Sequence, residues 1–488
     1  MESELSTPPR SNRRAARNAL VYIVLAFVQR GISILILPFV TRVLSPAEYG
    51  AVSVVTFTST IIGVVLGASL EPAVLRWSVR PEIQSARILW LCQRHFYLLV
   101  PGVSAVVSLL LFFTPAVFLG VESRIWAVEI FAAGLLASVA YYSTPLIRAR
   151  DQLVRFSAVS LIGIAATVGG KIYFVILNHW GVFGWVFSDL LAGLATFVAG
   201  IMLARVNRRG LWRAERVLMR FSAPLLPSRF ATWSLNSLNR PIMALVASQA
   251  SVGIFSLALN IAAVSTMLIG EVNRAFVTEY SRELFPAPSS ATRIYARIQL
   301  FLSFLAPSAI GVGIFLFGSA LIDIEFHAAF PIVGLLLIGQ AAYGIYIVPN
   351  NYVVQTSGRT KWSWVGPCIG ALTMGFGIIL FAPIGGEYAV ALVTVVGYVL
   401  MAISAFALVK HLKLVIRWRE LLRPGVSWIF CFGALAGSCA ALFFMAQPIG
   451  VLLALLGVAS GCAVLILERR EGGSLARLRR GTLQRVES

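Results

Sequence analysis

The sequence predicts an all-α polytopic membrane protein with about 14 transmembrane helices. Three observations support this fold class. Of the 488 residues, 58% are hydrophobic and only 12% are charged, whereas a soluble protein keeps about a quarter of its residues charged. Apolar stretches of about 20 residues, long enough to cross a bilayer, recur along the whole chain. The basic residues gather in alternate loops between these stretches.

The hydropathy pattern sets the predicted spans. They are 18–40, 51–70, 96–119, 126–147, 157–177, 183–204, 224–246, 252–275, 298–320, 331–355, 362–382, 388–409, 425–446 and 449–467.

The placement of positive charge predicts the topology. The net charge is +20, and most of the 40 Lys and Arg residues fall in loops that lie inside if the N-terminus is cytoplasmic. Only Arg42 and Arg124 fall in outer loops, so the positive-inside rule places both termini in the cytoplasm. Because the charge is spread over many loops, it excludes a nucleic-acid-binding face. The polar, basic residues 1–17 precede a long first span, which we interpret as uncleaved.

The cysteines and histidines give little basis for metal or redox chemistry. The five cysteines contain no CxxC pair and lie mostly in apolar segments, and the four histidines are scattered. We therefore expect no cofactor and no metal.

An internal repeat predicts the domain organisation. A shift of 203 residues aligns LPFVTRVLSPAEYGAVS (37–53) with RPIMALVASQASVGIFS (240–256), so that Pro38 falls on Pro241 and Gly50 on Gly253. The first span then corresponds to the seventh in the same orientation, a parallel repeat of the kind that transporters use. We expect two six-helix lobes around a central cavity, plus two further helices. The predicted segments are a basic N-terminus (1–17), an N-lobe (18–204), a linker (205–223), a C-lobe (224–409), a second linker (410–424), two helices (425–467) and a basic tail (468–488).

These two stretches also carry a family resemblance. Residues 37–53, and the passage FSAPLLPSRFATWSLNSLNRPIMALVASQASVGIFSLALNIA (221–262), resemble the polysaccharide-unit (O-antigen and exopolysaccharide) flippases. These belong to the multidrug/oligosaccharidyl-lipid/polysaccharide exporter superfamily. Asn239 stands where that family usually has Asp, and Phe255 where Tyr is common.

Polar residues in the seventh span point to a binding role. Arg229, Trp233, Asn236 and Arg240 recur at helical spacing. Inserting two deep arginines into the membrane costs about 5–7 kcal/mol of free energy. The eight Leu, Ile, Phe and Val residues of 224–246 offset roughly 2.4–4.8 kcal/mol of this insertion cost. We therefore expect this stripe to face a wet cavity or other polar groups, and Pro241 to break a backbone bond near Arg240.

Other polar residues fall within predicted spans, and two interpretations of them stay open. Lys171 with Asp189, and Arg229 with Glu271, are either structural ion pairs or functional groups. Asn236 and Asn239 are either interhelical hydrogen-bond partners or substrate ligands. The residues taken as substrate-binding candidates are Arg30, Arg240, Arg229, Lys171, Asn236, Asn239 and Gln29, and the ion-coupling candidates are Asp189 and Glu271.

The resemblance implies a transporter rather than an enzyme. It implies a polyprenyl-diphosphate-linked oligosaccharide moved from the cytoplasmic to the outer leaflet of a bacterial inner membrane, with a glycan polymerase and glycosyltransferases as expected partners. Excess positive charge in a cavity suits such an anion. An intramembrane carboxylate suits an ion relay, and coupling to H⁺, to Na⁺ or to neither ion stays open. One alternative is a multidrug antiporter of the same superfamily, which typically needs acidic cavity groups. Another is a membrane glycan polymerase or ligase, which carries a sizeable outer loop, whereas the outer loops here are short.

Overall fold

A computed structural model shows a helical membrane protein, which confirms the predicted fold class. It describes residues 36–67, 69–78, 83–204, 218–220, 222–223, 226–282, 290–414, 416, 418–421, 425–445 and 447–470. Within them, ten helices are long and apolar enough to span a membrane, and a shorter apolar helix covers Val426–Ala441. The strands β1 (Val117–Phe118) and β2 (Val121–Glu122), each two residues long, form a hairpin that joins two helices.

The chain divides into two compact units, described separately. Unit 1 comprises residues 1–40, 59–116 and 122–226, and unit 2 comprises 41–58, 117–121 and 227–488. Helix α3 (Pro46–Leu66) contributes its first part to unit 2 and its second part to unit 1.

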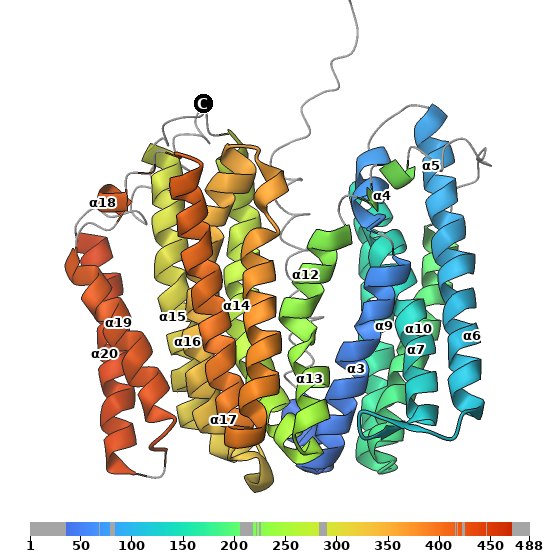
Figure 1. The fold of residues 1–488 in the computed structure, drawn as a ribbon, viewed down its shortest axis with the longest axis horizontal. Coiled ribbons are helices and arrows are strands. Elements are labelled where there is room, and N and C mark those ends of the chain that lie inside the picture. Colours follow the sequence, from blue (N-terminus) through green and yellow to red (C-terminus); the bar gives the residue numbers. More distant parts are fainter. Residues whose placement is uncertain are drawn as a thin grey trace, which may run out of the picture. The chain divides into compact units, whose positions relative to one another are not determined.

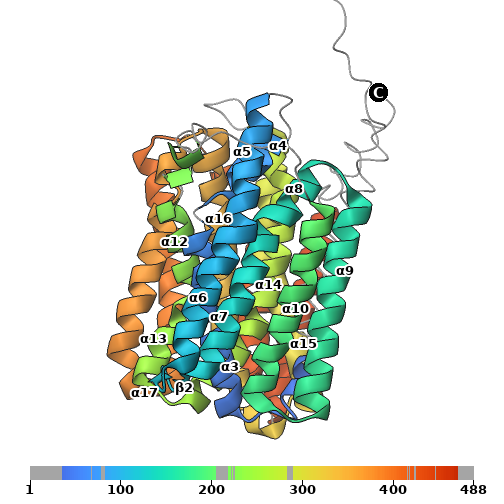
Figure 2. The same cartoon turned by 90° about the vertical axis from the view of Figure 1, so that its right-hand side faces the viewer.

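Unit 1 is a bundle of long helices. Helix α7 packs against α6 and α10, and α10 packs against α9, as Figure 2 shows. Its buried core includes Phe96, Tyr142 and Leu146. Besides α3, the elements are α2 (Leu37–Val40), α4 (Glu71–Ser78), α5 (Ile83–Arg94), η1 (His95–Leu99), α6 (Val100–Phe113), α7 (Ser123–Ser138), η2 (Val139–Ser143), α8 (Thr144–Ala149), α9 (Leu153–Gly170), η3 (Lys171–Leu177) and α10 (Gly181–Leu203).

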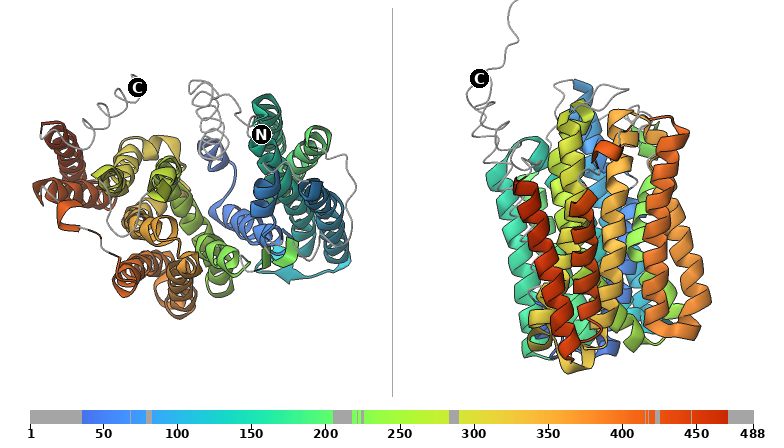
Figure 3. Two further views of the ribbon diagram at one scale, coloured as in Figure 1. Left: turned by 90° about the horizontal axis from the view of Figure 1, so that it is seen from above. Right: turned by 90° about the vertical axis from the view of Figure 1, so that its left-hand side faces the viewer.

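Unit 2 is built around α16, which packs against α14, α15, α17 and α19 (Figure 1). The last two long helices, α19 and α20, pack along each other, as the right-hand view of Figure 3 shows. The elements are α12 (Leu226–Ser237), α13 (Asn239–Val246), α14 (Gln249–Arg282), α15 (Ser290–Leu321), η5 (Ile324–Phe326), α16 (Ala329–Asn351), η6 (Tyr352–Thr356), η7 (Thr360–Trp362), α17 (Val365–His411), α18 (Trp418–Leu421), α19 (Gly425–Ala441) and α20 (Pro448–Arg470).

Helix α17 covers most of the predicted span 362–382 and all of the predicted span 388–409. The chain kinks between them at Gly386, which has φ 54° and ψ −144°. Because a side chain is strained at this positive φ, glycine suits the connection. Two spans therefore follow each other with almost no loop.

The repeat-equivalent residues of α3 and α14 meet at a close crossing inside unit 2. A Cβ atom on Gly50 would lie 2.0 Å from the carbonyl oxygen of Gln249, and a Cβ atom on Gly253 would lie 1.8 Å from that of Pro46. The 203-residue shift pairs Pro46 with Gln249 and Gly50 with Gly253. The contact is therefore symmetric under the repeat, and each glycine allows the other helix's backbone to approach.

Candidate functional site

The polar segment 232–241 lies where the seventh span is interrupted. Helix α12 ends at Ser237 and α13 begins at Asn239. Pro241 has no N–H, and its ring conflicts with the carbonyl of the residue four positions earlier, which is Ser237. The expected break near Arg240 is therefore present. The residues of the predicted stripe differ in burial, because Asn236 is exposed whereas Trp233 and Arg240 are buried. That the stripe faces a wet cavity or other polar groups stays a prediction.

Arg240 is one of the most deeply buried large side chains, at 2% exposure. Its Nη2 donates to Asn260 Oδ1 at 2.9 Å, and its Nη1 donates to the Asn236 carbonyl oxygen at 3.3 Å. The guanidinium carbon lies 3.4 Å from the centre of the Phe57 ring. Uncharged groups therefore hold the cation through hydrogen bonds and a cation–π contact.

Within the residues that the structure describes, no carboxylate lies at ion-pair distance from Arg240. Its Nε is buried and has no hydrogen-bond partner there. Intramembrane charges normally pair with an opposite charge or mark a ligand path. The donor capacity that Arg240 leaves unused is therefore suited to an anion.

Asn260 links Arg240 to helix α3. Its Nδ2 donates to the Tyr49 hydroxyl at 2.9 Å, so its two ends bridge an arginine and a tyrosine. Tyr49 is itself buried and packs edge-on against Phe326, with ring centres 5.8 Å apart. The site thus joins the first part of α3 to α13 and α14, within unit 2.

The neighbouring candidates on α12 and α13 have different surroundings. Asn239 is buried, and its Oδ1 accepts a hydrogen bond from the backbone N–H of Arg240 at 3.0 Å. Arg229 is half-buried, eleven positions before Arg240. Trp233 is buried and lies against Phe230, with ring centres 5.8 Å apart. Asn239 therefore positions the backbone of Arg240.

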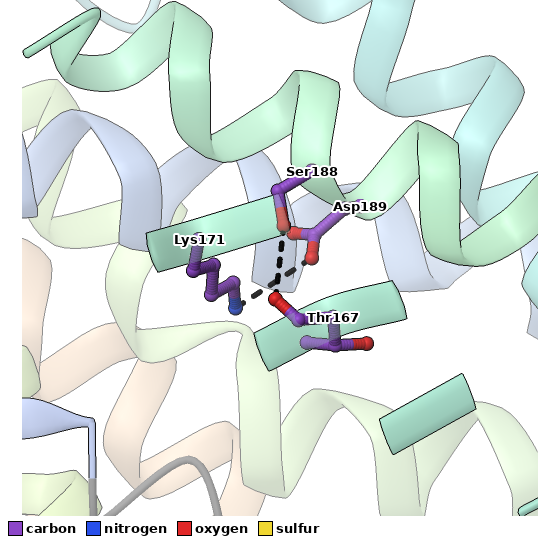
Figure 4. A network of polar contacts seen from close by, with 4 residues as sticks. All are labelled: Thr167, Lys171, Ser188 and Asp189. Carbon is purple, nitrogen blue, oxygen red and sulfur yellow. Dashed lines mark hydrogen bonds and ion pairs between the residues drawn. The ribbon is translucent and has the colours of Figure 1, made fainter. Parts of the chain in front are cut away.

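Unit 1 contains a second charged cluster, drawn in Figure 4. Lys171 Nζ lies 3.6 Å from Asp189 Oδ1 and 3.7 Å from the centre of the Trp185 ring. Beside this pair, the Ser188 hydroxyl donates to the Thr167 carbonyl oxygen at 3.2 Å, which ties α10 to α9. The structure therefore brings the two predicted residues Lys171 and Asp189 together.

The remaining candidates lie elsewhere or outside the described residues. Glu271 accepts a hydrogen bond from Arg274 at 2.6 Å, one turn along α14. Gln29 and Arg30 fall outside the described part of the chain. Their predicted roles stay predictions.

Four contributing residues were absent from the sequence-based candidates: Glu129, Asn260, Tyr49 and Phe57. Glu129 lies within the predicted span 126–147 and is 3% exposed, so an acid in an apolar segment was a visible signal. Tyr49 and Phe57 gave no such signal, because both are ordinary residues in a membrane helix. Only the folded chain brings them to Arg240 and Asn260.

Comparison with solved structures identifies the fold. A structure described as "Lipid II flippase MurJ, inward closed conformation" matches with a TM-score of 0.66 and 14% sequence identity, covering 92% of this chain and 99% of that one. An inward-facing multidrug resistance MATE family transporter of the MOP superfamily matches with a TM-score of 0.59 and 13% identity, covering 83% of this chain and 99% of that one.

Comparison at the sequence level identifies the family. No curated protein matches the chain significantly. A family model described as "Polysaccharide biosynthesis protein" matches residues 15–277, which is more than half of the chain. The chain is therefore a multi-pass membrane protein with the fold of these exporters, and it belongs to the polysaccharide biosynthesis protein family.

Proposed function

We propose that the protein is a flippase that moves polyprenyl-diphosphate-linked glycan units from the cytoplasmic to the outer leaflet by alternating access. The product would supply surface polysaccharide biosynthesis. The observation that carries this proposal is the buried Arg240, which has no acidic partner among the described residues. Membership of a polysaccharide biosynthesis family supports a glycan as the cargo.

The chemistry of Arg240 fits the diphosphate of such a substrate. A guanidinium presents a planar fork of donors that binds phosphate oxygens in pairs, and a low-dielectric site strengthens the contact. Asn260 and Phe57 hold this fork without neutralising its charge. We propose that Arg240 binds the diphosphate or an acidic sugar, with Arg30 as a second cation.

The other candidates have supporting roles in this proposal. The other substrate-binding candidates would contribute polar contacts to the substrate; they are Asn236, Asn239, Gln29, Arg229 and Lys171. Asp189 or Glu271 would serve ion coupling. The protein would lie in the bacterial inner membrane with both termini cytoplasmic. Glycosyltransferases would act before it, and a glycan polymerase would act after it.

The experiment measures in which leaflet the lipid-linked glycan accumulates. A strain lacking the protein is complemented with the native chain, Arg240→Ala or Arg359→Ala, and glycosidase access is compared in inside-out and right-side-out vesicles. Arg359 is an exposed arginine of the same unit that donates to the Leu412 carbonyl oxygen at 3.2 Å, so it controls for loss of a basic residue.

We expect Arg240→Ala to trap the glycan on the cytoplasmic face, and the native chain and Arg359→Ala to clear it. Equal clearance by Arg240→Ala at matched protein levels would remove the assignment of Arg240. Glycan that reaches the outer face unpolymerised without the protein would favour the polymerase or ligase. Normal glycan with altered drug accumulation would favour the multidrug antiporter.

A further inference from the structure

Unit 1 buries three titratable side chains on three helical segments. Glu129 on α7, Lys171 at the start of η3 and Asp189 on α10 are 3%, 7% and 8% exposed. Helix α10, which carries Asp189, packs against both α7 and η3, the segments that carry Glu129 and Lys171. Figure 4 shows the Lys171 side chain directed towards Asp189.

The two carboxylates have unequal surroundings. Asp189 has the Lys171 ammonium 3.6 Å away. Glu129 interacts electrostatically with both Asp189 and Lys171, but its Oε2 is buried without a hydrogen-bond partner among the described residues. One carboxylate is therefore ion-paired, whereas the other has an oxygen that nothing described satisfies.

The charges of the cluster do not balance. If all three groups are ionised, two carboxylates and one ammonium leave a net charge of −1. An uncompensated charge in a buried site costs several kcal/mol, so one more positive charge is required for neutrality. Because the Lys171 ammonium already contacts both Asp189 and the Trp185 ring, a proton on Glu129 is the smallest charge that completes the site.

The described groups on the surrounding elements do not supply that charge. Helix α6 carries no titratable side chain, and the basic and phenolic groups on the other elements have their own contacts. Arg124 of α7 lies over the Phe112 ring, and Arg155 of α9 donates to Gln152 and Leu203. Tyr142 of η2 donates to Gln93, and Tyr141 of η2 packs against the core of unit 1. Tyr173 of η3 is exposed.

The backbone geometry also changes at Lys171. The helix changes from α to π geometry at this residue, and the wider turns continue to Leu177. Such π segments are frequent at functional sites because they alter the direction of side chains. Here the change coincides with the ammonium of the cluster.

We propose that Glu129, Lys171 and Asp189 form a site that binds and releases one proton, with Glu129 as the group that carries it. On binding, an O–H bond forms at the Glu129 carboxylate and the site becomes neutral. On release, the ammonium of Lys171 is the counter-charge for both carboxylates. Use of this proton to drive transport rests on the proposed flippase function, whereas the binding itself does not.

The test follows the protonated carboxyl group directly. The full-length protein in lipid nanodiscs is titrated with acid and base, and the C=O band of protonated carboxyl groups is followed by infrared difference spectroscopy. The variants are Glu129→Gln, Glu129→Asp and, as a matched control, Glu122→Gln. Glu122 is an exposed acid at the N-terminal end of the same helix.

We expect one component of this band to titrate in the native chain and in Glu122→Gln, to be absent from Glu129→Gln, and to return with a shifted midpoint in Glu129→Asp. A band that persists unchanged in Glu129→Gln overturns the proposal. The titration is repeated with Na⁺ replaced by choline. A midpoint that does not depend on Na⁺ supports a proton site, whereas a midpoint that falls as Na⁺ rises assigns the site to sodium and overturns the proton assignment.

Transport measurements separate this inference from the flippase proposal. If the Glu129→Gln variant lacks the band and its glycan clearance no longer depends on pH, the proton drives transport. If the native chain shows the band but flips no glycan, the flippase proposal fails and the proton site stands.

Discussion

The crossing of α3 and α14 gives a prediction whose size follows from the geometry. Replacing Gly50 with Ala places a Cβ atom 2.0 Å from the Gln249 carbonyl oxygen, and replacing Gly253 places one 1.8 Å from that of Pro46. A carbon atom and a carbonyl oxygen approach to about 3.3–3.6 Å. Either substitution therefore requires the two helix backbones to separate by roughly 1.3–1.8 Å.

Each single substitution should destabilise the protein by about 1–3 kcal/mol, the usual cost of overpacking. The double variant should lose less than the sum of the two, because one separation of the helices relieves both contacts. Such coupling between touching residues is typically about 0.5–3 kcal/mol. Thermal unfolding and denaturant unfolding of the purified protein in detergent measure these differences.

Gly270→Ala is the control, since nothing lies within 4 Å of a Cβ atom at that position on the same helix. It should be neutral or stabilising by up to about 1 kcal/mol, because alanine favours helix over glycine. Gly50→Ala combined with Gly270→Ala should be additive. The reasoning is refuted if Gly50→Ala proves as stable as Gly270→Ala. It is also refuted if the losses of stability at Gly50 and Gly253 add up in the double variant.

Three further predictions concern the buried charges. Asn260→Asp should raise the melting temperature and slow glycan clearance. It places a carboxylate at the position now 2.9 Å from Arg240 Nη2, where the carboxylate competes with a bound anion. Faster clearance in the vesicle assay would contradict this prediction. Lys171→Met should lower the free energy of unfolding by about 3–5 kcal/mol, because it leaves buried carboxylates without their ammonium partner. Arg240→Met should cost only about 1–3 kcal/mol, since its described partners are uncharged; equal losses on denaturant unfolding would refute this contrast. Phe57→Leu should lower stability by about 0.5–2 kcal/mol through loss of the cation–π contact, and Phe57→Trp should retain it, as melting temperatures would show.

The spans could be predicted from the sequence because burial in lipid leaves a strong local signal. Each segment of about 20 apolar residues is recognisable without knowledge of its neighbours. The pairing of Lys171 with Asp189 was also accessible, because consecutive spans usually pack together and a buried charge needs a partner.

The surroundings of Arg240 could not be predicted in the same way. Tyr49 and Asn260 are 211 residues apart in the sequence, and Phe57 resembles any other apolar residue of its helix. The repeat makes Gly50 and Gly253 equivalent, but equivalence alone does not imply contact. Only the close crossing of α3 and α14 brings Tyr49 to Asn260, and so determines what surrounds the arginine.

The two buried clusters differ in the sign of the charge that they leave unbalanced. Around Arg240 the described groups leave one positive charge, which attracts an anion. Around Asp189 and Glu129 they leave one negative charge, which attracts a cation. Because no described side chain belongs to both clusters, an anionic substrate and a proton would not compete for the same ligands. Any coupling between them would then have to come from conformational states that favour one occupancy over the other, since a ligand shifts a conformational equilibrium only by its differential affinity for the states. Asn260→Asp should therefore weaken glycan clearance while leaving the infrared titration of Glu129 unchanged.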